Sequence, residues 1–451
     1  MRLHRWVIFL VLTALLAGCA PQPAPIPDPA PDTARSVTPS LMPTVVQTNT
    51  PLPIAEPTPF SIPTPAPVTQ ACVAVNSRTS PKTGGILVLK ETRDLGPVNV
   101  IITSFLLDMD QGEMTPISVP GELFGIVGVS PDRRLLLYEY DDGSFDVFRL
   151  AVIDSQGRVI NVFGNRILPE LWWSYYNWQS ENTLRVVIDD DQKGGILLRL
   201  YHIDTQEYLP LKTDWQDIYA GGEPEWGIDQ KALDLRLYKN TNIVYDPAIS
   251  RVVYPKKGQV ISLTDVETGQ ELASIQLPQW GRLPRWSDNG EHLVLIASAD
   301  PKAVLGHDEF FIVSRDGPHF KRLTYLTKQF DKVHISDYAW SPDGKQIAFW
   351  LNTEAEDPAL EGTQSELAIV DVDTGEITRL CIEGISAPVW DNIVIRHIQP
   401  VWSPDGHQIA FAQFDKSKTN SYNVLIVDLD TKTVSRVATN KEPIGWMVKE
   451  P

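Results

Sequence analysis

One five-residue pattern occurs three times in this chain and constrains its fold more than any other feature. It reads Trp-Ser-Pro-Asp-Gly at residues 340–344 and 402–406, and Trp-Ser-Asp-Asn-Gly at residues 286–290. A short apolar run follows each copy at once, at residues 347–349, 409–411 and 293–296. A repeat period of roughly 40 to 60 residues predicts that the chain stacks copies of one small β unit.

The residue types in the pattern are those of a tight turn between two strands. Proline fixes φ near the value that the second position of a turn requires, and glycine accepts a positive φ. Aspartate can accept hydrogen bonds from nearby backbone N–H groups, and tryptophan can fill space between stacked sheets. We therefore interpret the following residues as structural: Trp286, Trp340, Pro342, Asp343, Gly344, Trp402, Pro404, Asp405 and Gly406. Because Ser287, Ser341 and Ser403 recur at one turn position, we interpret them as turn caps rather than nucleophiles.

Each turn is followed by the same succession of strands. A β-branched run ends in an acidic turn and leads to one more strand, as at residues 367–375 and 376–380. Four strands per unit is the content of one propeller blade. Degenerate copies of the turn near residues 129, 178 and 245 bring the number of predicted units to six.

The two ends of the chain look like parts of one further unit. Residues 443–448 resemble an entry strand that stops, while residues 86–89, 100–108 and 114–117 resemble three strands that lack one. We predict an all-β fold, a β-propeller of four-stranded antiparallel blades, in which the N- and C-terminal strands share a sheet and close the ring. Closure removes open sheet edges. It favours seven blades, and six remain an alternative if the ends form a separate capping sheet.

The repeat resembles a known family. The Trp-Ser-Pro-Asp-Gly turn followed by Ile-Ala-Phe is similar to the WD40-like repeats of the TolB propeller, and to propellers attached to prolyl-oligopeptidase-type enzymes. The resemblance is strong at residues 286–290, 340–349 and 402–411 and weak before residue 245. It implies a TolB-like propeller over residues 73–451. No helix-rich domain precedes it here, so the partner contacts that TolB makes through such a domain are not carried over.

The N-terminus predicts export and lipidation. Arg2 and Arg5 precede an apolar run at residues 6–16, which leads into Leu16-Ala-Gly-Cys19, a pattern that resembles the bacterial lipobox. We expect a signal peptide at residues 1–18, lipidation of Cys19, and attachment to the cell membrane or outer membrane with the propeller outside the cytoplasm. The alternative, an uncleaved transmembrane anchor, is disfavoured because a span needs roughly 20 apolar residues. The type of host envelope stays open.

Residues 19–72 are predicted to be the lipidated cysteine and a disordered linker. This stretch is rich in proline and threonine, as in Ile62-Pro-Thr-Pro-Ala-Pro67, and such a composition cannot bury a core. Cys72 and Cys381 remain after lipidation of Cys19. Export permits a disulfide between them, and two separate thiols are the alternative.

Charge and motifs narrow the classes of function. The formal net charge of −18 argues against nucleic acid and anionic lipid surfaces as partners. No His-Glu-x-x-His, Gly-x-Ser-x-Gly or phosphate-binding glycine loop occurs. We therefore expect no catalytic residues, no cofactor and no metal, and a monomer. Aromatic residues between residues 211 and 240, among them Trp215 and Trp226, either line a binding face or pack between sheets.

The leading hypothesis is a membrane-anchored, non-catalytic platform that binds a protein or glycan at one propeller face. One alternative is an enzyme, a lyase or a glycan or peptide hydrolase, with an active site on the ring axis. Such a site would draw acids and histidines from several blades, which sequence spacing does not exclude. Another alternative is an accessory subunit of an envelope complex.

Overall fold

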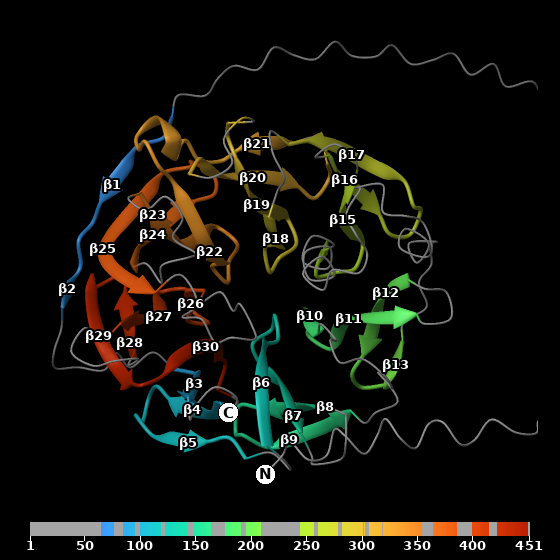
Figure 1. Cartoon of the computed structure of the whole chain (residues 1–451), viewed down its shortest axis with the longest axis vertical. Helices are drawn as coiled ribbons and strands as arrows, with labels where there is room; N and C mark the ends of the chain where they lie inside the picture. Colours follow the sequence, from blue (N-terminus) through green and yellow to red (C-terminus); the bar gives the residue numbers. More distant parts are fainter. Residues whose placement is uncertain are drawn as a thin grey trace, which may run out of the picture. The chain divides into compact units, whose positions relative to one another are not determined.

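Seven sheets arranged in a ring make up the described part of the chain (Figure 1). The computed structural model describes residues 65–75, 84–94, 100–118, 122–141, 148–163, 176–190, 195–208, 244–256, 260–277, 282–300, 302, 306–317, 319–353, 364–385, 399–414 and 422–449. The chain divides into residues 1–62, which lie outside the described residues, and residues 63–451. The predicted seven-bladed β-propeller is confirmed, and the six-bladed alternative does not apply.

Each blade contains four antiparallel strands. Blade 1 has the order β30 (Glu442–Met447), β3 (Ile86–Asp94), β4 (Val100–Asp108) and β5 (Met114–Pro116). Blade 2 has β6 (Glu122–Val129), β7 (Leu135–Asp141), β8 (Phe148–Asp154) and β9 (Val159–Phe163). Blade 3 has β10 (Tyr176–Ser180), β11 (Thr183–Asp190), β12 (Gly195–His202) and β13 (Glu207–Tyr208). Blade 4 has β14 (Val244–Tyr245), β15 (Arg251–Lys256), β16 (Val260–Asp265) and β17 (Glu271–Gln276).

Blades 5 to 7 follow the same plan, and the last two carry an extra strand. Blade 5 has β18 (Arg282–Trp286), β19 (His292–Ser298), β20 (Asp308–Ser314) and β21 (Phe320–Arg322), followed by the short 3₁₀ helix η2 (Leu326–Lys328). Blade 6 has β22 (His334–Trp340), β23 (Gln346–Asn352), β24 (Gln364–Asp371), β25 (Ile377–Ile385) and the added β1 (Val68–Gln70). Blade 7 has β26 (Val401–Trp402), β27 (Gln408–Phe414), β28 (Tyr422–Asp428), β29 (Thr433–Thr439) and the added β2 (Ala74–Val75).

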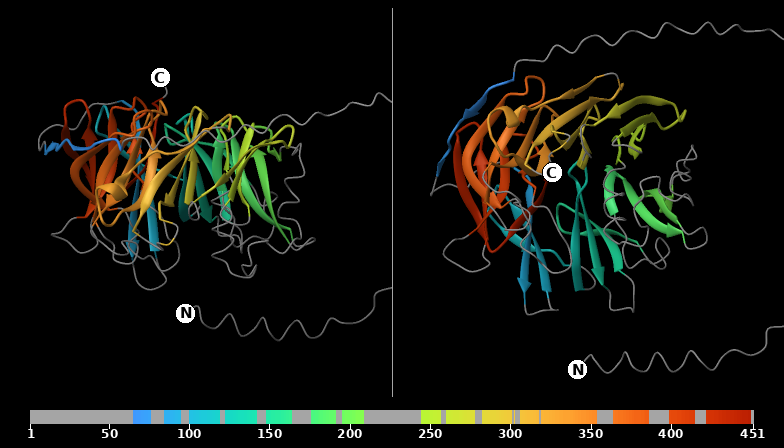
Figure 2. Two further views of the ribbon diagram at one scale, coloured as in Figure 1. Left: turned by 90° about the horizontal axis from the view of Figure 1, so that it is seen from above. Right: turned by 45° about the horizontal axis from the view of Figure 1, so that its top comes forward.

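The apolar runs of the sequence are explained by packing between blades. Successive side chains of a strand point to opposite faces of its sheet, and here both faces are covered by neighbouring blades. In β19, Leu293 and Leu295 pack with residues of blade 4, whereas Val294 and Ile296 pack with residues of blade 6. Seven such apolar clusters lie between neighbouring blades around the ring. The blades stand side by side in the views of Figure 2.

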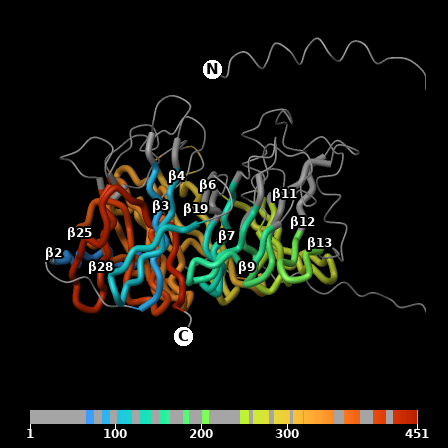
Figure 3. The backbone as a smooth tube through the Cα atoms, turned by 90° about the horizontal axis from the view of Figure 1, so that it is seen from below, coloured from blue at the N-terminus to red at the C-terminus, as the bar shows by residue number. Residues whose placement is uncertain are grey.

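The antiparallel order sorts the connections between the two faces of the ring. The innermost strand of each blade, such as β22, lies nearest the centre in Figure 1 and ends in the repeated turn. We call the face that carries residues 130–134, 246–250, 287–291, 341–345 and 403–407 the turn face. The connections that join the second to the third strand, and one blade to the next, leave from the opposite face. In the edge-on view of Figure 3, the turn face is the lower side, where the C-terminus lies.

The ring closes in blade 1, as the sequence predicts. Strand β30 pairs antiparallel with β3, so that Ile86 lies opposite Met447 and Leu87 lies opposite Trp446. Strand β3 pairs with β4, and β4 with β5. The innermost strand of this blade therefore comes from the C-terminus, and the other three come from the first part of the described chain.

A second closure, which the sequence did not predict, runs along the outside of the ring. Strand β1 pairs parallel with β25, and β2 pairs parallel with β29, so one segment covers the outer edges of blades 6 and 7 (Figure 1). We call residues 68–75 the strap. Cys72 forms a disulfide with Cys381 of β25, with 4.9 Å between the two Cα atoms. The strap thus includes residues 68–72, which belong to the stretch interpreted as linker.

No helix within the described residues has the length and apolarity that a membrane crossing requires. Cys19 and the rest of residues 1–64 lie outside those residues, as do residues 209–243 with Trp215 and Trp226.

Candidate functional site

The repeated turns are built alike and use their serines for structure. The Ser341 hydroxyl donates to Asp343 Oδ1 at 2.6 Å and accepts the backbone N–H of Gln346 at 2.9 Å. The same pair of bonds occurs at Ser130, Ser287 and Ser403. Because Ser287, Ser341 and Ser403 are also buried, their hydroxyl groups are not positioned to attack a substrate.

Neighbouring turns touch one another around the axis. Gly344 and Gly406 have φ angles of 70° and 77°, in the left-handed region that favours glycine. A Cβ at Gly344 would lie 2.9 Å from the Asn289 side chain of blade 5, and a Cβ at Gly406 would lie 3.6 Å from Pro342 of blade 6. On the turn face, the turns of neighbouring blades therefore pack against one another around the axis.

The repeat tryptophans link each blade to the one before it. The indole N–H of Trp340 donates to the carbonyl of Arg285, and that of Trp402 donates to the carbonyl of Ala339, each at 3.1 Å. Trp178 makes the equivalent bond to Gly128 at 2.8 Å. The exception is Trp286, whose buried Nε1 has no hydrogen-bond partner among the described residues.

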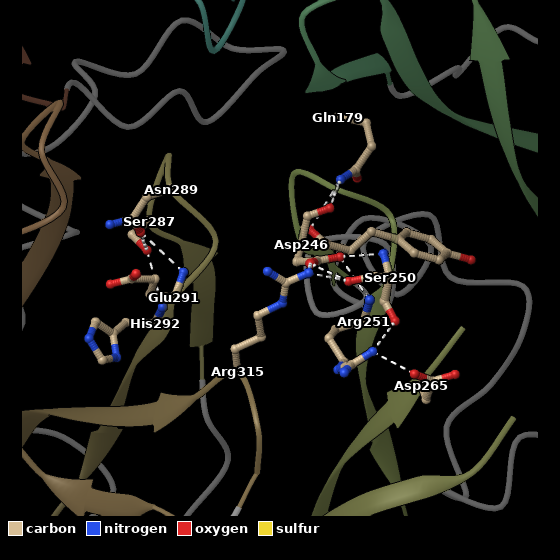
Figure 4. A network of polar contacts seen from close by, with 11 residues as sticks. Gln179, Asp246, Ser250, Arg251, Asp265, Ser287, Asn289, Glu291, His292 and Arg315 are labelled. Carbon is tan, nitrogen blue, oxygen red and sulfur yellow. Dashed lines mark hydrogen bonds and ion pairs between the residues drawn. The ribbon is translucent and has the colours of Figure 1, made fainter. Parts of the chain in front are cut away.

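Blade 4 replaces the turn serine with a buried carboxylate, Asp246 (Figure 4). Its Oδ1 accepts the backbone N–H groups of Ser250 at 2.6 Å and Arg251 at 2.7 Å. Arg315 of blade 5 lies 3.3 Å from its Oδ2 and donates to the Ser250 hydroxyl at 2.6 Å. Gln179 of blade 3 donates to the Asp246 carbonyl at 2.7 Å. This network braces blades 3, 4 and 5 against each other, and its charged groups are occupied by that role.

Arg133 crosses the ring axis on the turn face. It occupies the turn position that is Gly344 in blade 6, with a φ of 63°, a conformation that costs roughly 1–2 kcal/mol for a residue with a Cβ. Its Nη1 donates to the Trp402 carbonyl of blade 7 at 2.7 Å, and its Nη2 lies 3.8 Å from Asp288 of blade 5. A side chain of blade 2 can reach blades 5 and 7 only across the centre, so Arg133 obstructs the axis at this mouth.

The pKa values of Arg133 and Asp288 are shifted by their surroundings on the turn face. Burial raises the pKa of Asp288 to about 6, although Arg133 opposes the shift. Burial also lowers the pKa of the Arg133 guanidinium, partly offset by Asp288 and Asp405. Both groups therefore sit where water is partly replaced by protein, a setting that strengthens electrostatic interactions.

Deeper along the axis, three consecutive innermost strands bring polar side chains together. Arg285 of β18 donates through Nη1 to Asp337 Oδ1 of β22 at 2.6 Å, to the Tyr338 carbonyl, and to Gln399 Oε1 at 3.3 Å. Gln399 immediately precedes blade 7. Because blade 6 stands between blades 5 and 7, this contact can form only along the channel wall. We call Arg285, Asp337 and Gln399 the axial cluster.

The axial cluster combines a buried acid with a partly exposed base. The Asp337 side chain is 1% exposed, whereas that of Arg285 is 28% exposed. Burial lowers the pKa of Arg285, but the charge and hydrogen bond of Asp337 together with the interaction with Tyr338 outweigh it, and the net shift of the pKa is upward. Asp337 Oδ2 is buried and has no hydrogen-bond partner in the described part of the chain. The acid therefore depends on Arg285 for compensation.

The sequence analysis missed both Arg133 and the axial cluster. A signal for Arg133 was present, since Ser-Pro-Asp-Arg replaces Ser-Pro-Asp-Gly at residues 130–133. Arg285 and Asp337 are charged residues that lie one and three positions before the repeat tryptophans, on strands whose other residues are mixed in polarity, so they do not stand out in the sequence. Within the described residues, no group of three or more His, Cys, Asp or Glu side chains is arranged to hold a metal ion.

Comparisons with known proteins concern the propeller. A family model described as the dipeptidyl peptidase IV N-terminal region matches residues 307–441. No curated protein matches the sequence significantly. Similar solved structures include TolB from Acinetobacter baumannii (14% identical, covering 81% of this chain and 83% of that chain, TM-score 0.39).

Two further solved structures are similar to a comparable degree. The β-propeller domain of Myceliophteria thermophila Cps50 (Swd1) is 14% identical, covering 78% of this chain and 98% of that chain, with a TM-score of 0.42. An oligogalacturonate lyase from Vibrio parahaemolyticus is 12% identical, covering 78% and 86%, with a TM-score of 0.42. Identities this low assign no activity, and the chain is assigned to the β-propellers on its own architecture.

Proposed function

We propose that this protein is an exported, lipid-anchored propeller that binds a partner or ligand without catalysing a reaction. The observation that carries the proposal is the axial cluster, in which three blades present Arg285, Asp337 and Gln399 along the channel wall. The recurrent serines take part in turn bonds and the Asp246 network braces neighbouring blades, whereas the partly exposed Arg285 of the axial cluster can meet a ligand.

Two features support a location outside the cytoplasm. The Cys72–Cys381 disulfide suits an oxidising compartment, and the N-terminal sequence ends in a lipobox-like Leu16-Ala-Gly-Cys19. In this proposal Cys19 carries the acyl chains, which hold the protein at a membrane surface. Labelling cells that express the full chain with a tagged fatty acid tests the anchor. We expect Cys19→Ser to abolish the label and release the protein from the membrane fraction.

Binding and catalysis are separated by one pair of measurements on the full chain. Partners are captured from solubilised envelopes by the native protein and by Arg285→Gln, and the same two proteins are assayed on glycan and peptide substrates. The proposal expects retention that weakens in Arg285→Gln and no turnover. Turnover that Arg285→Gln abolishes would establish the axial enzyme instead. Equal retention of partners by the native protein and Arg285→Gln would show that the partners bind away from Arg285, and it would favour the accessory-subunit alternative.

A further inference from the structure

The guanidinium of Arg285 is held in one orientation. Its Nη1 faces three acceptors, Asp337 Oδ1, the Tyr338 carbonyl and Gln399 Oε1, and the group lies over the Tyr338 ring with its central carbon 4.9 Å from the ring centre. Cation–π contact and three acceptors on one nitrogen leave little rotational freedom. Any ligand that binds Arg285 therefore meets a group that is already positioned.

The other edge of the guanidinium is available. Nε and Nη2 of Arg285 have no hydrogen-bond partner among the described residues, and the side chain as a whole is 28% exposed. Gln399 is exposed and accepts a hydrogen bond from Arg285 Nη1 through its carbonyl oxygen, which leaves its amide N–H groups as further donors close to the guanidinium.

We propose that this free edge of Arg285, together with the amide of Gln399, binds the carboxylate of a small ligand within the axial channel. Two parallel N–H groups of a guanidinium match the two oxygens of a carboxylate, which gives a bidentate and strongly oriented contact. This inference rests on the proposed binding function and names the chemistry of its ligand.

The local charge favours a monoanion over a phosphate. Asp337 already offsets the charge of Arg285, and Arg133 at the mouth is accompanied by Asp288 and Asp405. Among the described groups at the axis, the positive charges of Arg285 and Arg133 are each matched by a neighbouring carboxylate, so neither offers a surplus charge to compensate a dianion. A planar carboxylate carries a single negative charge and is bound mainly through the two parallel N–H groups of the guanidinium. It therefore requires less positive charge at the site than a phosphate dianion does.

The route to the cluster is set by Arg133. Asp337 and Gln399 lie three residues before Trp340 and Trp402, which places them about 10 Å inside the ring from the turn face. Because Arg133 obstructs the axis at the turn face, the ligand reaches Arg285 from the opposite face.

Paired probes test the inference on the full chain. Galacturonate is compared with galactose, and N-acetylglycine with N-acetylglycinamide, by ligand-observed NMR. Each pair differs in its carboxylate, and the two pairs distinguish a sugar acid from a peptide terminus as the source. We expect at least one carboxylate probe to bind with a Kd of roughly millimolar size, and its neutral counterpart to bind at least about tenfold more weakly.

Variants assign the binding to Arg285. Arg285→Lys keeps the charge but loses the fork and is expected to weaken binding about tenfold or more. Arg285→Gln leaves Asp337 buried and unpaired, so the double variant Arg285→Gln/Asp337→Asn, which keeps the shape and removes both charges, is measured beside it. Arg251→Lys, at the partly buried ion pair with Asp265 in blade 4, is the matched control and is expected to bind as the native protein does.

Three outcomes would overturn the inference. These are no binding of either carboxylate by the folded native chain, undiminished binding in the folded double variant, or tighter binding of inorganic phosphate than of the carboxylates. Partner capture that persists in Arg285→Gln, together with absent carboxylate binding, would remove the carboxylate site while leaving the binding platform in place.

Discussion

At the residue scale, the tryptophans and serines of the repeat are structural parts whose roles follow from their recurrence. A residue type that returns at one turn position must serve something common to every blade, and the bonds of Ser341 and Trp340 are of that kind. Arg133 and Arg285 occur once each. Their roles depend on side chains that reach across or along the axis, and no local sequence pattern encodes that distance.

The unpartnered indole of Trp286 provides a matched comparison for Trp340. We expect Trp340→Phe to lower the free energy of unfolding by about 0.5–1.5 kcal/mol more than Trp286→Phe, because only Trp340 loses a hydrogen bond. Both substitutions remove similar ring volume from similar burial. Chemical denaturation of the two variants measures the difference, and equal losses would mean that the bond between blades contributes nothing.

Asp288 gives the turn face a dependence on pH. Its pKa of about 6 in the fold lies above the ordinary value of 3.8, so the folded protein binds a proton more tightly than the unfolded chain does. The contribution of this group is therefore fully present below pH 4 and is lost as pH rises through 6. We expect the native protein to gain stability relative to Asp288→Asn as pH falls from 7 to 4.

Thermal melts of both proteins across that range measure the difference, with Asp343→Asn as a control from an equivalent turn. The pKa of Asp343 is lowered, since its bonds to Ser341 and Lys345 outweigh burial, so its own pH dependence has the opposite sign. A constant gap between the native protein and Asp288→Asn would show that the carboxyl titrates normally.

At the element scale, the sequence predicted four strands per blade from the clear repeats, and it located the degenerate copies of the turn near residues 129, 178 and 245. Alternation between two apolar faces is a local signal, and it survives when the turn motif decays. The strap was not predicted. Val68-Thr-Gln70 is short and follows a proline-rich stretch, and its partner strand β25 lies some 300 residues away, so nothing local marks it as a strand.

The strap is held by its disulfide as well as by backbone bonds. We expect Cys72→Ser/Cys381→Ser to lower the free energy of unfolding by about 2–4 kcal/mol, because the cross-link restricts the unfolded chain. Denaturation of the double variant and of the reduced native protein measures the loss. The two should agree, since both remove the same bond, and an unchanged midpoint in either would contradict the expected contribution.

At the scale of the whole molecule, ring closure could be predicted because the first three strands lack an innermost strand and the C-terminus carries one strand without a blade. The contacts of Arg133 across the axis and those of the axial cluster could not be predicted, because they depend on how the seven blades meet at the axis. The observed pairing of Leu87 with Trp446 also brings both residues into one apolar cluster with blade 7.

Removing the closing strand should open the ring. Deletion of residues 442–451 takes away the buried Trp446 and Met447, each contributing about 1.5–3 kcal/mol, and uncovers the inner edge of β3. We expect a lower melting temperature and association in sedimentation experiments. A peptide of residues 440–451 added in excess should restore the monomer, while deletion of residues 450–451 alone should have no effect. Normal melting of the longer deletion would mean that β30 does not close the ring.

The strap also decides where mechanical load enters the molecule. Tension applied through the chain that precedes β1 acts first on β1 at the outer edge of blade 6, and the Cys72–Cys381 bond then transfers the load to β25 before it reaches β2 on blade 7. The non-covalent seam between β30 and β3 belongs to blade 1 and lies outside that load path. A force on the N-terminal segment would thus be carried by the disulfide. The pairing of β30 with β3, which closes the ring, would not bear that force.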